Sequence, residues 1–363
     1  MDLRQRFRRK HPDFPLLELT EPRRVEDHLR GLGWLEEGET FLGCSRAGEG
    51  NMNLTLRVHT DRRTLIVKQS RPWVEKYDQI AAPLDRALVE QAFYERITEI
   101  PEVASRMPRL LGADADSRCL ALEDLGEDSE DLSTLYADGE LSLDEARSLG
   151  AYLAALHQGT RVELGKAVDE VLLNRAMRGL NHEHLFVIPL SPGNGLDLEP
   201  HEAGLGAAAA VLQADPAVAQ RAAELGQRYL ADGPCLVHGD FFPGSWLRTA
   251  KSGVRVIDPE FCHYGDPELD LGVATAHLVV AGQSRDLVWA LLETAGVAQR
   301  DESLVARYSG IEVIRRLIGV AQLPLAPTEG RRAGLLLRAR DALVAGDLET
   351  WWRRDGAENG DPA

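Results

Sequence analysis

The stretch HGDFFPGSWL occupies residues 238–247, and a second stretch, VIDPEFCHYGD, occupies residues 256–266. The first follows the apolar run CLV, and the second completes the apolar run VRVI. Both runs are short and rich in branched aliphatic residues, which is typical of a buried strand. An aspartate therefore follows each of two predicted strands, Asp240 after the first and Asp258 after the second.

The two strand ends are expected to bring these carboxylates to one spot, an arrangement that suits metal-assisted phosphoryl transfer. Asp240 is predicted to orient the attacking hydroxyl, and Asp258 is predicted to bind magnesium. Glu260 would face the same side as Asp258, because side chains alternate in an extended chain, and magnesium prefers such oxygen ligands. Taken singly, each carboxylate is also explained as a turn or cap residue, but their occurrence together favours the catalytic interpretation.

Three polar residues around this motif are interpreted as structural. His238 is expected to pack and hydrogen-bond the loop that carries Asp240, although its position also invites a general-base role. Asp270, in LDLG, is expected to brace the same loop. His157 ends an apolar helical stripe and is expected to be a core histidine.

A glycine-containing turn and a lysine precede this motif in the chain. The turn AGEGNMNL places Gly48 and Gly50 between two predicted strands, where backbone N–H groups can approach phosphate oxygens, although a tight hairpin explains the glycines equally well. Lys68 ends the apolar strand TLIVK and can neutralise nucleotide phosphates if a carboxylate holds it. Glu90 is the candidate partner and Glu95 its competitor. The alternative is that Lys68 extends into solvent.

A pair of arginines follows in the segment IEVIRRLIG. Arg315 falls on the apolar stripe of Ile311 and Ile318, and a semi-buried arginine requires an anionic partner such as a phosphate. Arg316 has a simpler account, because Glu312 lies four residues earlier and forms a favourable helix pair.

The composition bounds the class of protein. The chain has 363 residues, of which 44% are hydrophobic, so it is long enough for one large or two globular domains. A net charge of −17 without a basic stripe argues against nucleic-acid or anionic-membrane binding. No apolar run approaches the roughly 20 residues of a membrane helix, and no signal peptide is predicted. The cysteines lack C-x-x-C spacing and are expected to be reduced thiols of a cytoplasmic protein: Cys44, Cys119, Cys235 and Cys262.

The periodicity of the chain predicts an α+β fold with two lobes. A helical extension is expected in residues 1–37, a β-meander from Phe41 to Gln69, a helix over 84–99 and two strands after Pro108. The remainder is mostly helical, with one helix expected over 204–230 and a capping box formed by Ser142 and Glu145. We therefore predict an N-terminal lobe over 1–125, a larger helical lobe over 126–352 and a polar tail over 353–363, with a ligand-binding cleft between the lobes.

The order of these motifs resembles the protein-kinase-like fold and, within it, the aminoglycoside phosphotransferase superfamily, in which H-G-D replaces the H-R-D of protein kinases. More narrowly, the sequence resembles the methylthioribose kinase family. The resemblance runs from about residue 25 to residue 350 and rests on these stretches: GEGNMNL, IVKQSRPWV, LALEDL, NRAMRGLNHEHLFVIP, HGDFFPGSWL, DPEF and EVIRRLIG. At Phe242 the sequence departs from that family, which commonly has histidine there.

The resemblance implies a small-molecule kinase that uses ATP and Mg²⁺ to phosphorylate the 1-hydroxyl of S-methyl-5-thioribose in methionine salvage, working as a homodimer. It also implies that Asp240 orients the sugar hydroxyl and that Arg315 and Arg316 stabilise charge at the transfer site. The other implied roles are ATP binding by Gly48, Gly50, Asn51, Lys68, Glu90 and the backbone of Glu123 and Leu125, and metal binding by Asp258, Glu260 and Ser245.

Two alternatives remain open at the level of sequence. One is a kinase of the same superfamily with another acceptor, such as a different pentose, an amino alcohol or an aminoglycoside. The acidic net charge suits a cationic antibiotic, whereas Arg315 and Arg316 do not if they line the pocket. The other is a nucleotide-binding regulator without catalysis, which the presence of Lys68, Asp240 and Asp258 disfavours.

Overall fold

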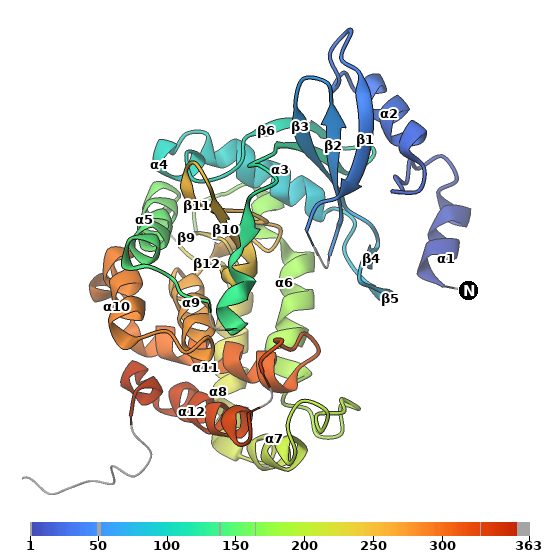
Figure 1. Ribbon diagram of the computed structural model, residues 1–363. Coiled ribbons are helices and arrows are strands. Elements are labelled where there is room, and N and C mark those ends of the chain that lie inside the picture. Colours follow the sequence, from blue (N-terminus) through green and yellow to red (C-terminus); the bar gives the residue numbers. More distant parts are fainter. Residues whose placement is uncertain (1, 49–51, 138, 164, 327, 354–363) are drawn as a thin grey trace, which may run out of the picture. The chain divides into compact units, whose positions relative to one another are not determined.

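The computed structural model describes residues 2–48, 52–137, 139–163, 165–326 and 328–353 (Figure 1). The chain forms two compact units. Unit 1 comprises Met1–Glu130, Ala167–Met177 and Leu247–His263, and unit 2 comprises Asp131–Lys166, Arg178–Trp246 and Tyr264–Ala363. The boundary expected at residues 125/126 places 167–177 and 247–263 in the helical lobe, whereas in the structure these two segments belong to unit 1.

Unit 1 is built on a five-stranded antiparallel sheet. Its first three strands are the blue arrows labelled β1, β2 and β3 in Figure 1. Its strands, in spatial order, are β1 (Phe41–Arg46), β2 (Leu54–Thr60), β3 (Thr64–Gln69), β7 (Cys119–Glu123) and β6 (Leu110–Asp114). Side chains of β2 alternate between buried and partly exposed positions, as its alternating sequence LTLRVHT requires. The predicted meander and the two later strands are therefore confirmed.

One face of this sheet carries the main apolar core of unit 1. Leu56, Val58 and Val67 pack there with Val25 and Leu29 of α2 (Pro22–Gly31). A smaller cluster joins α1 (Leu3–Lys10) to the β4 (Trp73–Val74) and β5 (Tyr77–Ala81) ribbon. The remaining elements of unit 1 are α3 (Arg86–Ile97), α4 (Pro101–Ala104), the 3₁₀ turn η2 (Glu170–Leu173), and the paired strands β10 (Trp246–Thr249) and β11 (Gly253–Val256).

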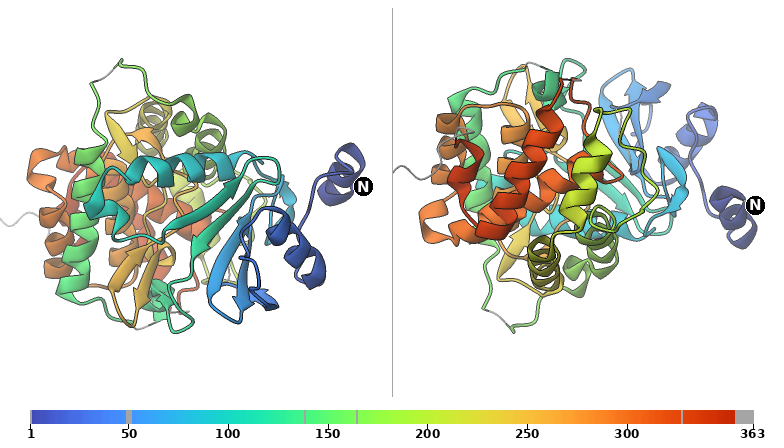
Figure 2. Two further views of the ribbon diagram at one scale, coloured as in Figure 1. Left: turned by 90° about the horizontal axis from the view of Figure 1, so that it is seen from above. Right: turned by 90° about the horizontal axis from the view of Figure 1, so that it is seen from below.

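Unit 2 is mainly helical. Helix α11 (Glu302–Ile318) packs on α9 (Glu268–Val280) and α12 (Arg331–Ala345), and the orange and red helices of Figure 2 show α11 and α12 side by side. Helix α10 (Arg285–Thr294) packs on α5 (Leu143–Gly159). The other elements are η1 (Leu132–Ala137), α6 (Arg175–His182), the π-helix η3 (Glu183–Val187), α7 (Leu205–Gln213), α8 (Pro216–Leu230), β9 (Cys235–Val237), η4 (Pro243–Ser245), β12 (His263–Gly265), η5 (Val297–Gln299) and η6 (Leu348–Trp351). The short strand β8 (Glu130–Asp131) lies at the point in the sequence where a segment of unit 1 ends and a segment of unit 2 begins.

Local sequence signals explain where several of these helices begin. The predicted capping box is present, since the Ser142 side chain accepts from the Glu145 N–H and the Glu145 side chain accepts from Ser142. The single helix expected over 204–230 is instead two helices. Pro216 has no N–H to continue a helix but suits the first turn of a new one, which Asp215 caps by accepting from the Ala217 N–H at 2.8 Å.

Two further findings concern the cysteines and the apolarity of the helices. All four cysteines are free thiols. Within the described residues, no helix has the length and apolarity to cross a membrane.

Candidate active site

Lys68 lies on β3 and forms an ion pair with Glu90 of α3. Its Nζ is 2.6 Å from the Glu90 Oε2, and it also pairs with the Asp258 carboxylate. Glu95, the competing candidate, is exposed and accepts instead from the Gln91 Nε2 at 2.8 Å. Five residues rotate a helix by roughly 140° from the starting side chain, so Glu90 and Glu95 cannot both face the sheet.

Burial and charge act in opposite directions on Lys68. Burial lowers the pKa of Lys68, but the carboxylates of Asp258, Glu90 and Glu260 overcome this and raise it above its ordinary value. Burial also raises the pKa of Glu90, and the nearby Asp258 adds to that rise while Lys68 opposes it. Lys68 is therefore a permanent cation, fixed on the inner side of its strand.

The Asp-Pro-Glu segment is not extended. Asp258 has a φ of 67°, a left-handed conformation that costs an L-residue about 1–2 kcal/mol and is concentrated at functional sites. The Cys262 N–H donates to the Pro259 carbonyl at 2.9 Å and closes a turn around Glu260. The expectation that strand alternation aligns Glu260 with Asp258 is therefore wrong. Both carboxylates do act on Lys68, but through this turn.

Asn174 supports the same turn from within unit 1. Its Nδ2 donates to the backbone carbonyls of Glu260 and Cys262, each at 2.9 Å. These two bonds hold the backbone of the turn at Glu260 and Cys262.

Arg86 and Asn53 hold the Glu260 carboxylate, and sequence reasoning missed both. The Asn53 Nδ2 donates to the Glu260 Oε2 at 2.8 Å, and the Arg86 Nε lies 3.3 Å from the same oxygen. Arg86 also donates from Nε to the Asn53 Oδ1 at 2.8 Å and from Nη2 to the Met52 carbonyl at 2.6 Å. Burial, together with Asp258, raises the pKa of Glu260 to about 7. One signal was available, because Arg86 lies one helical turn before Glu90 on the same face of α3.

The other predicted nucleotide-binding residues lie on the sheet and the segment after it. Gly48 has a φ of 64°, which glycine adopts without strain, whereas Gly50 and Asn51 fall outside the described residues. The Glu123 N–H donates to the Arg109 carbonyl at 2.9 Å. Leu125 lies two residues after the end of β7, in the connector that follows this strand.

Arg57 ties this connector to β2. Its Nε donates to the Asp124 Oδ2 at 2.7 Å and its Nη2 donates to the Gly126 carbonyl at 3.3 Å. The segment that carries Leu125 is therefore braced from the sheet. We name the charged side chains around Lys68 in unit 1 the Lys68 cluster, which consists of Lys68, Arg86, Glu90, Asp258 and Glu260.

In unit 2, the loop that carries Asp240 is fixed by Asp270. The Asp270 carboxylate accepts from the backbone N–H groups of His238 at 2.8 Å and Gly239 at 2.9 Å, and it also bonds the His157 Nε2 at 2.9 Å. Gly239 has a φ of 83°, which explains the glycine of H-G-D. The structural interpretations of Asp270 and His157 are confirmed.

Both arginines of α11 lie beside Asp240. The Arg316 Nη2 is 3.3 Å from the Asp240 Oδ1 and its Nε donates to Glu312 at 2.6 Å. The Arg315 Nη1 is 3.1 Å from Glu312 and 4.0 Å from the Asp240 Oδ1. Each arginine therefore forms an ion pair with Glu312 within α11 and also lies within 4.0 Å of the Asp240 carboxylate. We name these charges the paired-arginine cluster, which consists of Asp240, Glu312, Arg315 and Arg316.

The Asp240 carboxylate is mostly buried. Only 17% of its side chain is exposed, and burial raises the pKa of its carboxyl, whereas Arg316 and Arg315 oppose that rise. Ser245, predicted as a metal ligand, donates from Oγ to the Asp240 backbone carbonyl at 3.0 Å. The hydroxyl thus fixes the backbone of the Asp240 loop, and metal binding by Ser245 stays a prediction.

Residues 43–308 match the phosphotransferase enzyme family, APH, a range that includes Lys68, Asp240 and Asp258. The chain belongs to this family. The range ends before the paired arginines of α11, so family membership does not depend on them.

This phosphotransferase is 27% identical over 359 residues to the methylthioribose kinase of Bacillus pumilus (strain SAFR-032), a match that covers 87% of this chain and 88% of that relative. It is also 27% identical over 267 residues to the methylthioribose kinase of Exiguobacterium sibiricum, which covers 70% of this chain and 65% of that protein. The resemblance to methylthioribose kinases that the motifs indicate is confirmed. The protein is a small-molecule kinase, a phosphotransferase with a hydroxyl acceptor.

The fold of the phosphotransferase is similar to that of solved structures, among them an aminopropanol kinase. The microcompartment-associated aminopropanol kinase superposes with a TM-score of 0.53 at 15% identity, covering 90% of this chain and 99% of that one. Identity this low shows the fold alone. Together with the sheet of unit 1 and the helices of unit 2, it confirms the predicted α+β, kinase-like fold class.

The side chains of the phosphotransferase that would hold Mg²⁺ are carboxylates of the Lys68 cluster. In the described part of the chain, no three or more histidine, cysteine or acidic side chains are grouped as a metal site. Mg²⁺ usually takes only one or two carboxylates and completes its shell with water and substrate phosphates. Asp258, with 42% of its side chain exposed, fits that requirement, whereas Glu260 is buried.

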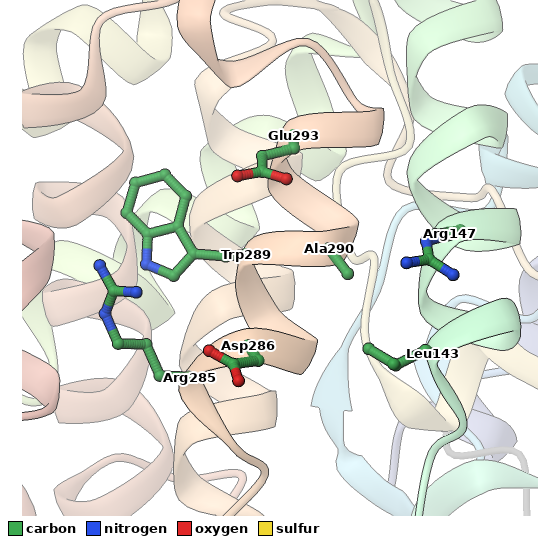
Figure 3. A pocket seen from close by; sticks show the side chains of 7 residues that line it. All are labelled: Leu143, Arg147, Arg285, Asp286, Trp289, Ala290 and Glu293. Carbon is green, nitrogen blue, oxygen red and sulfur yellow. The ribbon is translucent and has the colours of Figure 1, made fainter.

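A separate pocket of the phosphotransferase lies on unit 2 between α5 and α10 (Figure 3). Within it, Arg285 lies over the ring of Trp289 at 5.3 Å and pairs with Glu349 of η6. None of the predicted site residues lines it; its lining is Leu143, Arg147, Arg285, Asp286, Trp289, Ala290 and Glu293.

Proposed function

We propose that this phosphotransferase is an ATP- and Mg²⁺-dependent S-methyl-5-thioribose kinase of methionine salvage, which phosphorylates the 1-hydroxyl of the sugar. The observation that carries the chemistry is Asp240 held beside Arg315 and Arg316 in unit 2. The choice of acceptor is supported by the Bacillus pumilus relative, whose match spans most of both chains.

The Lys68 cluster is proposed to bind the donor. Lys68, fixed by Glu90, supplies a permanent positive charge for ATP phosphates, and the connector at Glu123 and Leu125 offers backbone groups to the adenine. Asp258 and Glu260 would hold Mg²⁺. When bound, that ion would neutralise charge on the β- and γ-phosphates.

The paired-arginine cluster is proposed to serve the acceptor. Asp240 accepts the hydrogen bond of the sugar hydroxyl and takes its proton as the hydroxyl oxygen forms a bond to the γ-phosphorus. The bond from that phosphorus to the β–γ bridging oxygen breaks, and ADP leaves with the electron pair. Arg315 and Arg316 face the charge on the phosphoryl oxygens, so positioning and charge neutralisation supply most of the rate enhancement.

A second candidate is a kinase of the same superfamily with another hydroxylated acceptor. The observation that favours it is Phe242, a half-buried aromatic ring whose centroid lies 4.8 Å from the Arg316 guanidinium. An apolar ring at that place changes which acceptor groups can approach Arg316. The free thiols support a cytoplasmic location, and a homodimer is proposed from the resemblance alone.

The test is a panel of acceptors incubated with radiolabelled ATP and Mg²⁺. We expect the phosphorylated product with S-methyl-5-thioribose, and at least tenfold lower kcat/KM with ribose, an amino alcohol and an aminoglycoside. Rapid turnover of an aminoglycoside with none of methylthioribose would reject the first candidate in favour of the second. If none of the acceptors in the panel led to the release of ADP, both candidates would be rejected.

A further inference from the structure

We propose that Glu312 is a positioning residue for phosphoryl transfer, and that a buried chain of three side chains, Tyr136, His277 and Glu312, fixes both arginines beside Asp240. The inference rests on the proposed function, because it assigns Asp240 to the acceptor hydroxyl. The three side chains come from three different elements of unit 2, η1, α9 and α11.

The Glu312 carboxylate contacts three side chains of unit 2. It is fully buried, and its oxygens lie 2.6 Å from the Arg316 Nε, 3.1 Å from the Arg315 Nη1 and 3.0 Å from the His277 Nε2. A buried carboxylate is costly unless charged or hydrogen-bonding groups surround it. Burial raises the pKa of Glu312, but Arg315, Arg316 and His277 together hold it well below the ordinary value. Glu312 is therefore ionised.

His277 connects Glu312 to Tyr136. Its Nε2 faces Glu312, and its Nδ1 bonds the Tyr136 hydroxyl. Burial lowers the pKa of His277 to about 4, so the ring is neutral at physiological pH and carries one N–H. An ionised carboxylate can only accept, so the proton belongs on Nε2, and Nδ1 accepts from the Tyr136 hydroxyl. Each hydrogen bond of the chain then has a fixed direction.

This chain distinguishes Glu312 from an ordinary helix pair. An exposed pair at this spacing contributes only about 0.3–0.5 kcal/mol and leaves both side chains free to rotate. Here both ends of the imidazole are fixed by α11 and η1, so the carboxylate cannot rotate without breaking the bond to His277.

The consequence is seen at Asp240. Glu312 engages the Arg316 Nε and the Arg315 Nη1, which leaves Asp240 with contacts of 3.3 Å and 4.0 Å from the two arginines. An unrestrained arginine closes on a carboxylate through two parallel hydrogen bonds at shorter distance. Glu312 therefore holds the arginines near Asp240 but prevents them from closing on it, and the carboxylate stays available to the acceptor hydroxyl.

Phe242 restrains the remaining freedom of Arg316. The guanidinium lies 4.8 Å from the Phe242 ring centroid, and the His277 ring lies 5.1 Å from the same ring. A Cβ at Gly244 would lie 2.6 Å from the Phe242 ring atoms, so glycine is required there for the ring to lie as it does. The ring and the chain thus fix Arg316 on two sides.

The test compares Glu312→Gln, Tyr136→Phe and their double variant in the full-length protein, with S-methyl-5-thioribose as acceptor. We expect Glu312→Gln to lower kcat about 100-fold, the effect of a misplaced catalytic group, with the KM for ATP within about twofold of wild type. Tyr136→Phe should lower kcat about three- to tenfold. The double variant should be no slower than Glu312→Gln, because both changes break one chain.

Glu202→Gln is the matched control. Glu202 is also a buried carboxylate of unit 2 and accepts from the first-turn N–H groups of α12, from Arg332 at 2.8 Å and Ala333 at 3.0 Å. Its loss should lower the Tm and leave kcat unchanged. A general loss of stability would therefore affect the control as well, whereas a positioning role affects only the chain.

The outcomes separate the two proposals. Wild-type protein without turnover of methylthioribose rejects the proposed function. Active wild type together with a folded Glu312→Gln variant whose kcat is within twofold of wild type overturns the positioning role. If the effects of Glu312→Gln and Tyr136→Phe on log kcat were additive, the proposal that the three side chains act as one chain would be overturned. If Glu312→Gln does not fold, Tyr136→Phe decides, and wild-type kcat in that variant overturns the inference.

Discussion

The Lys68 cluster of unit 1 and the paired-arginine cluster of unit 2 use similar side chains in different proportions. The first sets the carboxylates of Glu90, Asp258 and Glu260 against two cations, whereas the second sets the carboxylates of Asp240 and Glu312 against two arginines. The pKa values follow from this. Burial and the extra negative charge raise the pKa of Glu90 and Glu260, while two arginines hold that of Glu312 low.

The difference matches the two tasks that the reaction sets. An excess of carboxylate is what a divalent cation would balance, so the charge of the first cluster would be balanced only with its proposed metal ion. The second is balanced without a ligand, and its charges are held by neighbouring side chains. It can therefore present Asp240 in a fixed position before the acceptor arrives. The following predictions would break or sharpen this contrast.

Loss of the base should have the largest effect. We expect Asp240→Asn to lower kcat by about 10³-fold or more, because an amide cannot take the hydroxyl proton, and to leave ATP affinity unchanged. Steady-state kinetics and nucleotide titration measure the two quantities. Asp232→Asn, which alters the ion pair of Arg178 elsewhere in unit 2, is the control and should keep wild-type kcat. If Asp240→Asn retained most of its turnover, the assignment of Asp240 would be wrong.

Breaking the Lys68–Glu90 pair should have the next largest effect. Glu90→Gln removes the buried partner of Lys68 on α3, and we expect kcat/KM for ATP to fall about 100-fold as the lysine loses its fixed position. Glu95→Gln, an exposed change on the same helix, should match wild type. Equal kinetics of the two variants would contradict a role of the pair in ATP binding.

Arg86→Lys tests how the first cluster is held together. Lysine keeps the positive charge but lacks the fork that contacts Asn53, Met52 and Glu260 at once. We expect the free energy of unfolding to fall by about 2–3 kcal/mol and the Mg²⁺ concentration for half-maximal activity to rise several-fold. Urea unfolding and a Mg²⁺ titration measure these. A loss of stability with an unchanged Mg²⁺ requirement would separate Arg86 from the proposed metal site.

Acidification should act through His277, which contacts Glu312 of the second cluster. The pKa of His277 is about 4 in the fold against an ordinary value of 6.5, so below pH 6.5 the unfolded chain binds a proton that the folded chain does not. Its contribution is therefore present above pH 6.5 and is lost as the pH falls toward 4, amounting to about 2 kcal/mol between pH 7 and pH 5. Urea unfolding at the two pH values measures this. His277→Gln, which cannot titrate, should show a correspondingly smaller decrease, and an equal decrease would exclude His277 as the cause.

Much of the fold and part of the site were predictable, because the signals are local. The alternation of LTLRVHT, the capping box at Ser142 and the branched aliphatic runs before Asp240 and Asp258 each specify structure within a few residues. The strand β10 was missed, since the short segment WLRT has a weak pattern. The helix break at Pro216 was also missed, although a proline, which has no N–H to continue a helix, indicates such a break.

The site was predicted least well where two side chains are far apart in sequence. The order of motifs identified Lys68, Asp240 and the arginines as candidates, but it left Glu90 and Glu95 as alternatives. The helix face that packs on the sheet decided between them. The Asn53–Glu260 hydrogen bond joins residues 207 apart, and no local pattern predicts such a contact.

The sequence by itself determined which elements form, because backbone propensities and capping act over three or four residues. It also set the order in which the glycine turn, the lysine, H-G-D and D-P-E follow one another. Only the tertiary structure decided that Arg86 holds Glu260, and that Tyr136 reaches Glu312 through His277 from a position 141 residues before that histidine. A buried charge must find partners wherever the fold provides them, and those partners are set by packing between elements rather than by spacing along the chain.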